Sequence, residues 1–225
     1  TIDTTGRSLH RRGYRTSISS APLKETLAAA LVLLSFWRRD RPLIDPFCGS
    51  GTIPIEAAMI GRKLAPGRHR EFSAESWTSF PKQLWEKTRS SADEQCLPSL
   101  EERLIGIDID GRALKAAREN AERAGVAEDI HFQTGRMQDI SSSRRFGCVI
   151  TNPPYGQRIG DSRELDQLYA ELPLVLRRLQ LDQARQIPPR EAIAADDVRI
   201  GVQYLASTAR MELEIDRQPA EYEVT

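Results

Sequence analysis

Four short apolar runs divide this chain, and a glycine-rich or polar segment follows each run closely. The stretches between them contain good helix formers with apolar residues at helical spacing. An alternation of strands and helices is typical of a mostly parallel sheet with helices on both faces, so we expect an α/β fold. The four predicted strands are residues 42–45, 104–108, 130–133 and 148–151.

Helices are predicted between and after these strands, and several have recognisable ends. Asp110 suits a helix N-cap, and Gly61 and Gly125 suit helix ends. Pro173 lies inside a helical pattern and should kink or interrupt it. Residues 198–204 and 211–215 alternate apolar and polar side chains, which favours a closing antiparallel hairpin. The expected helices are residues 23–37, 53–60, 111–124 and 164–181, with another near 82–89.

The domain organisation follows from length and local composition. With 225 residues, of which 40% are hydrophobic, the chain can close one sizeable core. Residues 1–20 are polar and basic and read as a linker or arm, and residues 21–225 read as one domain with an insertion at about 62–103.

The three cysteines and the first apolar helix bear on the cell compartment. Cys48, Cys96 and Cys148 are odd in number and lack CxxC spacing, so neither disulfides nor a metal site is indicated, and a reducing cytoplasm fits. The apolar run at 26–37 is too short to span a bilayer and lacks a cleavage site, so we expect a buried helix and no membrane association.

Charge is balanced overall but unevenly distributed. Lys plus Arg and Asp plus Glu each number 32, so no global field attracts nucleic acid. Residues 1–41 nevertheless hold eight basic and three acidic side chains. Any single basic cluster is explained as solvent-exposed surface. The presence of a second basic cluster leaves nucleic-acid binding as an alternative. Its members are Arg62, Lys63, Arg68 and Arg70.

Ligands of open parallel sheets lie beyond the carboxyl ends of the strands, and three of these ends carry acids. Asp45 precedes Gly49 and Gly51, where glycine lets a ligand approach the backbone. The spacing GxGxxP departs from the dinucleotide pattern GxGxxG, so this segment alone is weak evidence. Asp108 suits the two hydroxyls of a ribose, since ionised acceptors form the stronger hydrogen bonds. Asp139 could accept the amino group of an adenine or simply occupy a turn.

The fourth strand end is the most specific signal. Asn152-Pro153-Pro154-Tyr155 presents a side-chain amide oxygen, a proline carbonyl and an aromatic face in one rigid turn. Two oxygen acceptors can hold both hydrogens of an exocyclic amine while Tyr155 stacks on the extruded base. Alkylation makes the amine proton acidic, so no strong general base is needed and the three histidines need no catalytic role.

These motifs together resemble a known family, the THUMP-associated RNA guanine-N2 methyltransferases, which includes bacterial 23S rRNA enzymes. The resemblance covers residue 1 to about 181, including Pro66-Gly67, Trp77 and Leu84-Trp85 of the insertion. The tail after about residue 182 does not match. The segments that carry the resemblance are Leu9–Arg15, Asp45–Ala58 and Asn152–Arg158.

The resemblance implies a Rossmann-like fold that binds S-adenosylmethionine and methylates guanine N2 in rRNA or tRNA. It implies catalysis by Asn152, Pro153, Pro154 and Tyr155. Family members carry an RNA-binding THUMP domain ahead of such a linker, and we expect it to be absent here. The predicted cofactor contacts are Asp45, Pro46, Phe47, Cys48, Gly49, Ser50, Gly51, Thr52, Asp108, Ile109, Asp139 and Asn152. The predicted phosphate contacts are Arg11, Arg12, Arg15 and Arg158.

Three other functions stay open at this stage. The Asn-Pro-Pro-Tyr turn also serves N6-adenine methylation of DNA or RNA, and methylation of a protein glutamine amide. A non-catalytic RNA-binding scaffold would keep the fold without turnover. The oligomeric state and the methylated nucleotide do not follow from one sequence.

Overall fold

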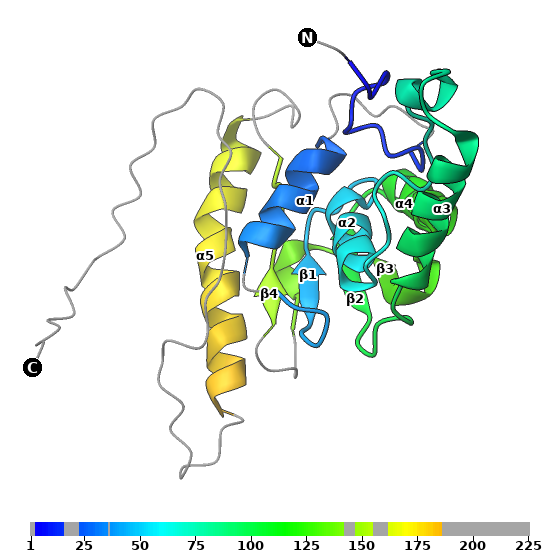
Figure 1. The fold of residues 1–225 in the computed structure, drawn as a ribbon. Helices are drawn as coiled ribbons and strands as arrows, with labels where there is room; N and C mark the ends of the chain where they lie inside the picture. Colours follow the sequence, from blue (N-terminus) through cyan, green and yellow to red (C-terminus); the bar gives the residue numbers. More distant parts are fainter. Residues whose placement is uncertain (1–2, 16–22, 36, 142–146, 155–161, 186–225) are drawn as a thin grey trace, which may run out of the picture.

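In the computed structural model the chain forms a four-stranded parallel sheet in the order β3-β2-β1-β4 (Figure 1). The structure describes residues 3–15, 23–35, 37–141, 147–154 and 162–185. The strands are β1 (Leu43–Asp45), β2 (Leu104–Asp108), β3 (Ile130–Thr134) and β4 (Cys148–Val149). The predicted parallel α/β sheet is therefore confirmed.

The two faces of the sheet belong to different hydrophobic clusters. Leu43 and Leu104 pack with α1 (Glu25–Leu34), α2 (Thr52–Gly61) and α4 (Gly111–Ala124). The adjacent residue Ile44 points to the opposite face, because side chains alternate along a strand. There it joins Val149 in a second cluster, which includes residues of α5 (Ser162–Arg185). Helices thus cover both faces of the sheet.

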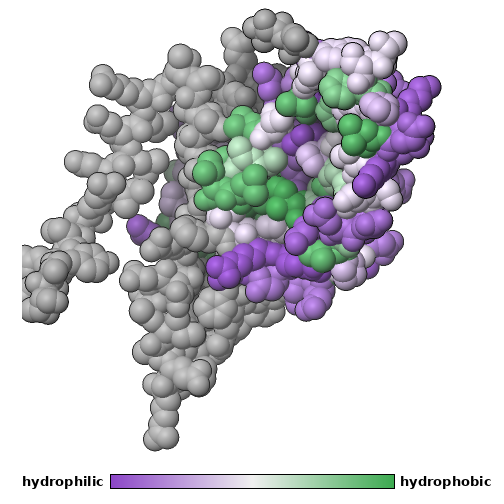
Figure 2. Space-filling view, viewed as in Figure 1, coloured by the Kyte–Doolittle hydropathy of each residue, from purple (hydrophilic) through white to green (hydrophobic). Residues whose placement is uncertain are grey.

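Most helices lie close to their predicted positions, with ends set by local hydrogen bonds. The Asp110 side chain accepts from the Arg112 N–H at 2.9 Å, and Gly125 ends α4 at φ 73°, as predicted. Helix α1 stops three residues before the predicted end. There Ser35 turns extended, and its hydroxyl donates to the Val32 carbonyl at 2.7 Å. Leu33 and Leu34 at the end of α1 are exposed, and apolar residues gather on the face of the molecule that Figure 2 shows.

Of the two outcomes predicted for Pro173, a kink or an interruption, the interruption does not occur. α5 runs continuously from Ser162 to Arg185 with Pro173 inside it. Proline removes the hydrogen bond to the carbonyl four residues earlier, which is that of Tyr169. Burial of Leu172 and Val175 against the sheet on either side of the proline holds the helix together. The predicted hairpin at 198–215 lies outside the described residues.

The insertion between α2 and β2 forms its own layer at the edge of the domain. It contains η1 (Ser73–Ser76) and α3 (Lys82–Glu94), which is longer than predicted and buries none of its residues. Trp85 stacks on Phe72 with ring centroids 5.9 Å apart. Arg70 donates to main-chain carbonyls of the arm, including that of Thr5 at 3.0 Å. The arm and the insertion therefore lie side by side (Figure 1).

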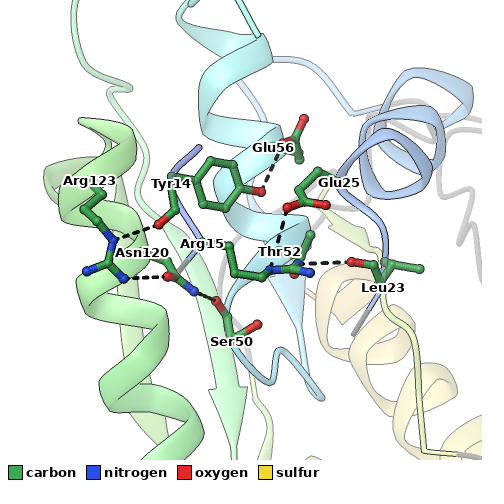
Figure 3. Close-up of polar contacts among 9 residues, drawn as sticks. All are labelled: Tyr14, Arg15, Leu23, Glu25, Ser50, Thr52, Glu56, Asn120 and Arg123. Carbon is green, nitrogen blue, oxygen red and sulfur yellow. Dashed lines mark hydrogen bonds and ion pairs between the residues drawn. The ribbon is translucent and has the colours of Figure 1, made fainter. Parts of the chain in front are cut away.

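Tyr14 anchors the predicted arm on the domain. The Tyr14 side chain is 1% exposed, and its hydroxyl donates to Glu56 at 3.0 Å (Figure 3). Burial raises the Tyr14 pKa well above its ordinary value, and burial also raises the pKa of the Glu56 carboxyl. Arg12 pairs with the other Glu56 oxygen at 3.4 Å.

Among the described residues, none of the helices is long and apolar enough to cross a membrane.

We predict that Tyr14→Phe lowers the free energy of unfolding by about 1–3 kcal/mol, because Glu56 loses a buried hydrogen-bond donor. Denaturant unfolding at neutral pH measures the change. Ser76→Ala also removes a hydroxyl, but at an exposed site, and should leave stability nearly unchanged. Equal stability of Tyr14→Phe and the wild-type protein would contradict the role of this contact.

Candidate active site

Asp45 lies at the carboxyl end of β1 and is almost completely buried. Its Oδ1 accepts the Thr151 hydroxyl at 2.6 Å and the Phe47 N–H at 3.2 Å. Its pKa is raised from 3.8 to about 7, chiefly because burial disfavours the charged carboxylate, although both hydrogen bonds lower the pKa. The ends of β1 and β4 are thus joined through a carboxyl that titrates near neutral pH.

The two loop glycines have different roles. Gly49 has φ +52°, and a Cβ added there would meet no atom within 4 Å. Its backbone therefore faces open space, as the approach of a ligand requires. Gly51 has φ +82°, and a Cβ there would lie 2.9 Å from the Phe132 ring and 3.0 Å from Ala117. Glycine at position 51 therefore lets the loop pack against β3 and α4.

Asp108 at the end of β2 has one backbone donor on each carboxylate oxygen. The Gly49 N–H donates to Oδ2 at 2.8 Å, and the Asp110 N–H donates to Oδ1 at 2.9 Å. Each carboxylate oxygen can accept a second hydrogen bond, which leaves capacity for two ligand hydroxyls. Beside it, Ile109 is 73% exposed and offers an apolar surface. A diol next to an aromatic ring fits this arrangement.

The third strand end carries Asp139 in the short turn η3 (Met137–Asp139). Asp139 is exposed, whereas Met137 is buried in the second cluster. The turn is therefore anchored by its first residue and presents its last residue to solvent. Asp45, Asp108 and Asp139 follow three different strands at the same edge of the sheet, as the sequence analysis predicts.

The turn at the end of β4 is described through Pro154. The Ile150 N–H donates to the Ile44 carbonyl at 3.1 Å, so pairing with β1 continues up to the turn. Thr151 bonds Asp45, and the next residue, Asn152, is half-buried. The Pro154 carbonyl accepts the Tyr169 hydroxyl from α5 at 2.7 Å. Tyr155 lies outside the described residues.

Side chains that the sequence analysis missed hold the loop in place. Asn120 on α4 is fully buried and donates to the Ser50 carbonyl at 3.0 Å (Figure 3). Arg123 donates to Asn120 at 2.8 Å and to the Tyr14 carbonyl at 2.8 Å. The signal for Asn120 was its place on the apolar face of α4, where an amide needs a partner.

The predicted phosphate-binding arginines differ in exposure. Arg11 is exposed, whereas Arg12 pairs with Glu56. Arg15 pairs with Glu25 at 3.8 Å and donates to the Leu23 carbonyl and the Thr52 hydroxyl. Arg158 lies outside the described residues. Contact with phosphate thus stays a prediction. Of the described arginines in this set, the exposed Arg11 is the best placed to make that contact.

Among the described residues, histidines and potential metal ligands form no second centre. Burial lowers the pKa of His69, and that residue belongs to the insertion, not to the strand ends. In the part of the chain described above, no three His, Cys, Asp or Glu side chains gather as a metal ion would require. The arrangement of acids, glycine loop and proline turn is therefore the site that the structure offers.

Known proteins are similar in sequence to most of this chain. YpsC of Bacillus subtilis (strain 168) is 46% identical over 172 residues, which are 76% of this chain and 45% of that protein. The ribosomal RNA large subunit methyltransferase K/L of Vibrio cholerae is 45% identical over 174 residues, which are 75% of this chain and 25% of that protein. The chain thus spans less than half the length of these curated relatives.

Crystal structures show the same fold. A Listeria monocytogenes protein titled a predicted N6-adenine-specific DNA methylase is 47% identical with a TM-score of 0.75, covering 80% of this chain and 47% of that one. SMU.472, crystallised with S-adenosylhomocysteine (SAH), is 44% identical with the same TM-score and the same coverage. The Rossmann-like methyltransferase fold is therefore confirmed.

A family model covers the strand ends, the glycine loop and the proline turn together. It is described as UPF0020, RMKL-like methyltransferase domain, and it matches residues 12–187. That range includes every element from α1 to α5. The chain belongs to the RMKL-like methyltransferase domain family.

Proposed function

We propose that this chain transfers a methyl group from S-adenosylmethionine to the exocyclic N2 of a guanine in RNA. The observation that carries the proposal is the Asp45–Thr151 hydrogen bond of 2.6 Å. It fixes the Asn152 turn at the same edge of the sheet as the open Gly49 loop. An acceptor of the methyl group and its donor would therefore meet at one edge.

The methyl donor is S-adenosylmethionine, since the chain is a methyltransferase of this family and its relative SMU.472 binds SAH. When bound, the cofactor supplies a methyl group on a positively charged sulfonium. Asp108 would hold the ribose hydroxyls, exposed Ile109 would contact the adenine, and Asp139 would accept its amino group. The carboxyl groups at the ends of β1 and β2 would favour a ligand that carries a positive charge.

The proline turn would hold the acceptor. The Asn152 amide oxygen and a proline carbonyl would accept the two hydrogens of the base amine, which frees its lone pair for attack. The Pro154 carbonyl already accepts a hydrogen bond from the Tyr169 hydroxyl, so we assign this role to the Pro153 carbonyl. Tyr155 would stack on the base. One amine proton would leave after the C–N bond forms, without a dedicated general base.

RNA is the favoured substrate for two reasons. The curated relative from Vibrio cholerae is named a ribosomal RNA methyltransferase, and the motifs resemble the guanine-N2 family. Methylation of adenine N6 is the second candidate, because the Listeria structure is titled a predicted N6-adenine-specific DNA methylase. Both bases offer a planar amine, so the product decides between them.

We predict that Asn152→Ala lowers kcat by about 10²–10³-fold, as expected when one preorganised hydrogen-bond partner is removed at a reacting centre. Binding of SAH, measured by calorimetry, should change little. Methyl transfer from labelled cofactor to RNA measures the rate, with exposed Ser76→Ala as the control. A variant that turns over normally would contradict the role of this turn.

We predict that Asp45→Asn stabilises the protein more at pH 8 than at pH 5. A raised pKa means that the folded state holds a proton which the unfolded chain releases, so stability is lost as pH rises from 3.8 toward about 7. The gain at pH 8 is at most about 4 kcal/mol, from the size of this shift. Denaturant unfolding at both pH values measures it.

The same Asp45→Asn substitution should weaken S-adenosylmethionine binding at pH 8 by about tenfold, or about 1.4 kcal/mol, because a negative charge beside the cationic sulfonium is lost. An equal stability change at both pH values would contradict the charge assignment. Unchanged affinity would show instead that the carboxylate serves the turn alone.

We predict that RNA from a strain lacking this protein gains N2-methylguanine when it is incubated with the protein and S-adenosylmethionine. Nucleoside mass spectrometry distinguishes this product from N6-methyladenine. The Asn152→Ala protein is the negative control. If N6-methyladenine were the sole product, the target would be adenine and not guanine. If the protein bound SAH but produced no methylated nucleoside, the result would contradict an RNA target.

A further inference from the structure

Helix α5 contacts the proline turn at residues 151–154, called the acceptor turn below, through the Tyr169 side chain. The Tyr169 hydroxyl donates to the Pro154 carbonyl at 2.7 Å. Two consecutive prolines have no N–H groups, so this part of the turn cannot be held by its own backbone donors. A partner that binds a proline carbonyl is therefore a direct way to fix the turn, and Tyr169 supplies it.

The same helix holds the segment beside the predicted adenine site. Arg178 donates to the Gln138 carbonyl at 2.5 Å and to the Ile140 carbonyl at 2.8 Å. The Gln138 side chain donates to Glu171 at 2.5 Å. The hydrogen bond from Gln138, and to a lesser extent that from Gln167, lowers the Glu171 pKa because each favours the ionised carboxylate. Turn η3, which carries Asp139, is thus bonded to α5 at its backbone and at a side chain.

Helix α5 is itself anchored between these two groups of contacts. Leu172, Val175 and Leu179 are buried in the second hydrophobic cluster, together with Met137 of η3. Tyr169 lies before this apolar face, and Arg178 lies beside its end. A single packed helix therefore bonds the acceptor turn at one place and the donor side of the site at another.

We propose that Tyr169 is a positioning residue that holds the acceptor turn for methyl transfer, while Arg178 positions the η3 segment from the same helix; this rests on the function proposed above. Tyr169 contacts the turn at the Pro154 carbonyl. Its effect passes through the Pro154 carbonyl to the turn that carries Asn152 and Pro153. Arg178 acts on the opposite side, through the backbone next to Asp139.

The two residues should therefore affect different kinetic constants. Tyr169→Phe removes only the hydroxyl, and a loosened acceptor turn should lower kcat by about 10–100-fold, because small misplacements of reacting groups are costly. The dissociation constant of SAH should stay within about twofold. Arg178→Gln should raise the KM for S-adenosylmethionine several-fold with a smaller effect on kcat. Arg177→Gln, exposed and one residue earlier, is the matched control and should change neither constant.

The test combines methyl transfer to RNA with hydrogen exchange measured by mass spectrometry on the whole chain. Tyr169→Phe should accelerate exchange in the peptide 148–154 and leave the β1 peptide unchanged. Lower kcat with normal SAH binding and faster exchange at 148–154 supports the proposal. Wild-type kcat, unchanged exchange, or a joint loss of SAH affinity and thermal stability overturns it.

Failure of the proposed function gives a different pattern. In that case the wild-type protein binds SAH but methylates no RNA, and Asn152→Ala has no activity to lose. The exchange readout still decides whether Tyr169 holds the turn. If the wild-type protein methylates RNA and Tyr169→Phe behaves as the wild type, the positioning role is overturned and the proposed function stands.

Discussion

The hydrogen bond between Asp45 and Thr151 is the contact on which the site depends. It joins the carboxyl ends of the neighbouring strands β1 and β4 at 2.6 Å, inside the protein. Burial raises the pKa of the Asp45 carboxyl to about 7. Ionisation of this buried carboxyl therefore lowers the stability of the folded protein. Such a cost is common where a protein must bind or react, because groups suited to function are seldom the most stable choice.

Around that contact, three supports come from different parts of the chain. The arm reaches the glycine loop through Arg123, Asn120 and the Ser50 carbonyl (Figure 3). The β2 end reaches it through Asp108. α5 reaches the proline turn through Tyr169 from the other face of the sheet. The loop and the turn are short and carry glycine or proline, so packed elements on both faces must fix their conformation.

The elements with strong local signals were predicted well. The four strands lie where the apolar runs are, and Asp110 and Gly125 bound α4 as their residue types indicate. Local signals were less decisive where tertiary contacts outweigh local preference. Pro173 does not break α5, because packing on both sides of it offsets one missing hydrogen bond. The glycine at position 51 has a packing role that spacing alone did not indicate, since its neighbour Phe132 comes from a distant strand.

The sequence by itself determined the parallel α/β fold and the order of the acids and the proline turn along the chain, because strand periodicity and turn chemistry are local properties. It also identified the methyltransferase family through motifs that agree in order and spacing. Only the tertiary structure decided that Arg12 and Arg15 pair with buried carboxylates, and that Tyr169 and Asn120 bond the proline turn and the glycine loop. Those contacts join residues far apart in sequence, and no local pattern records which distant side chain a folded backbone will bring near.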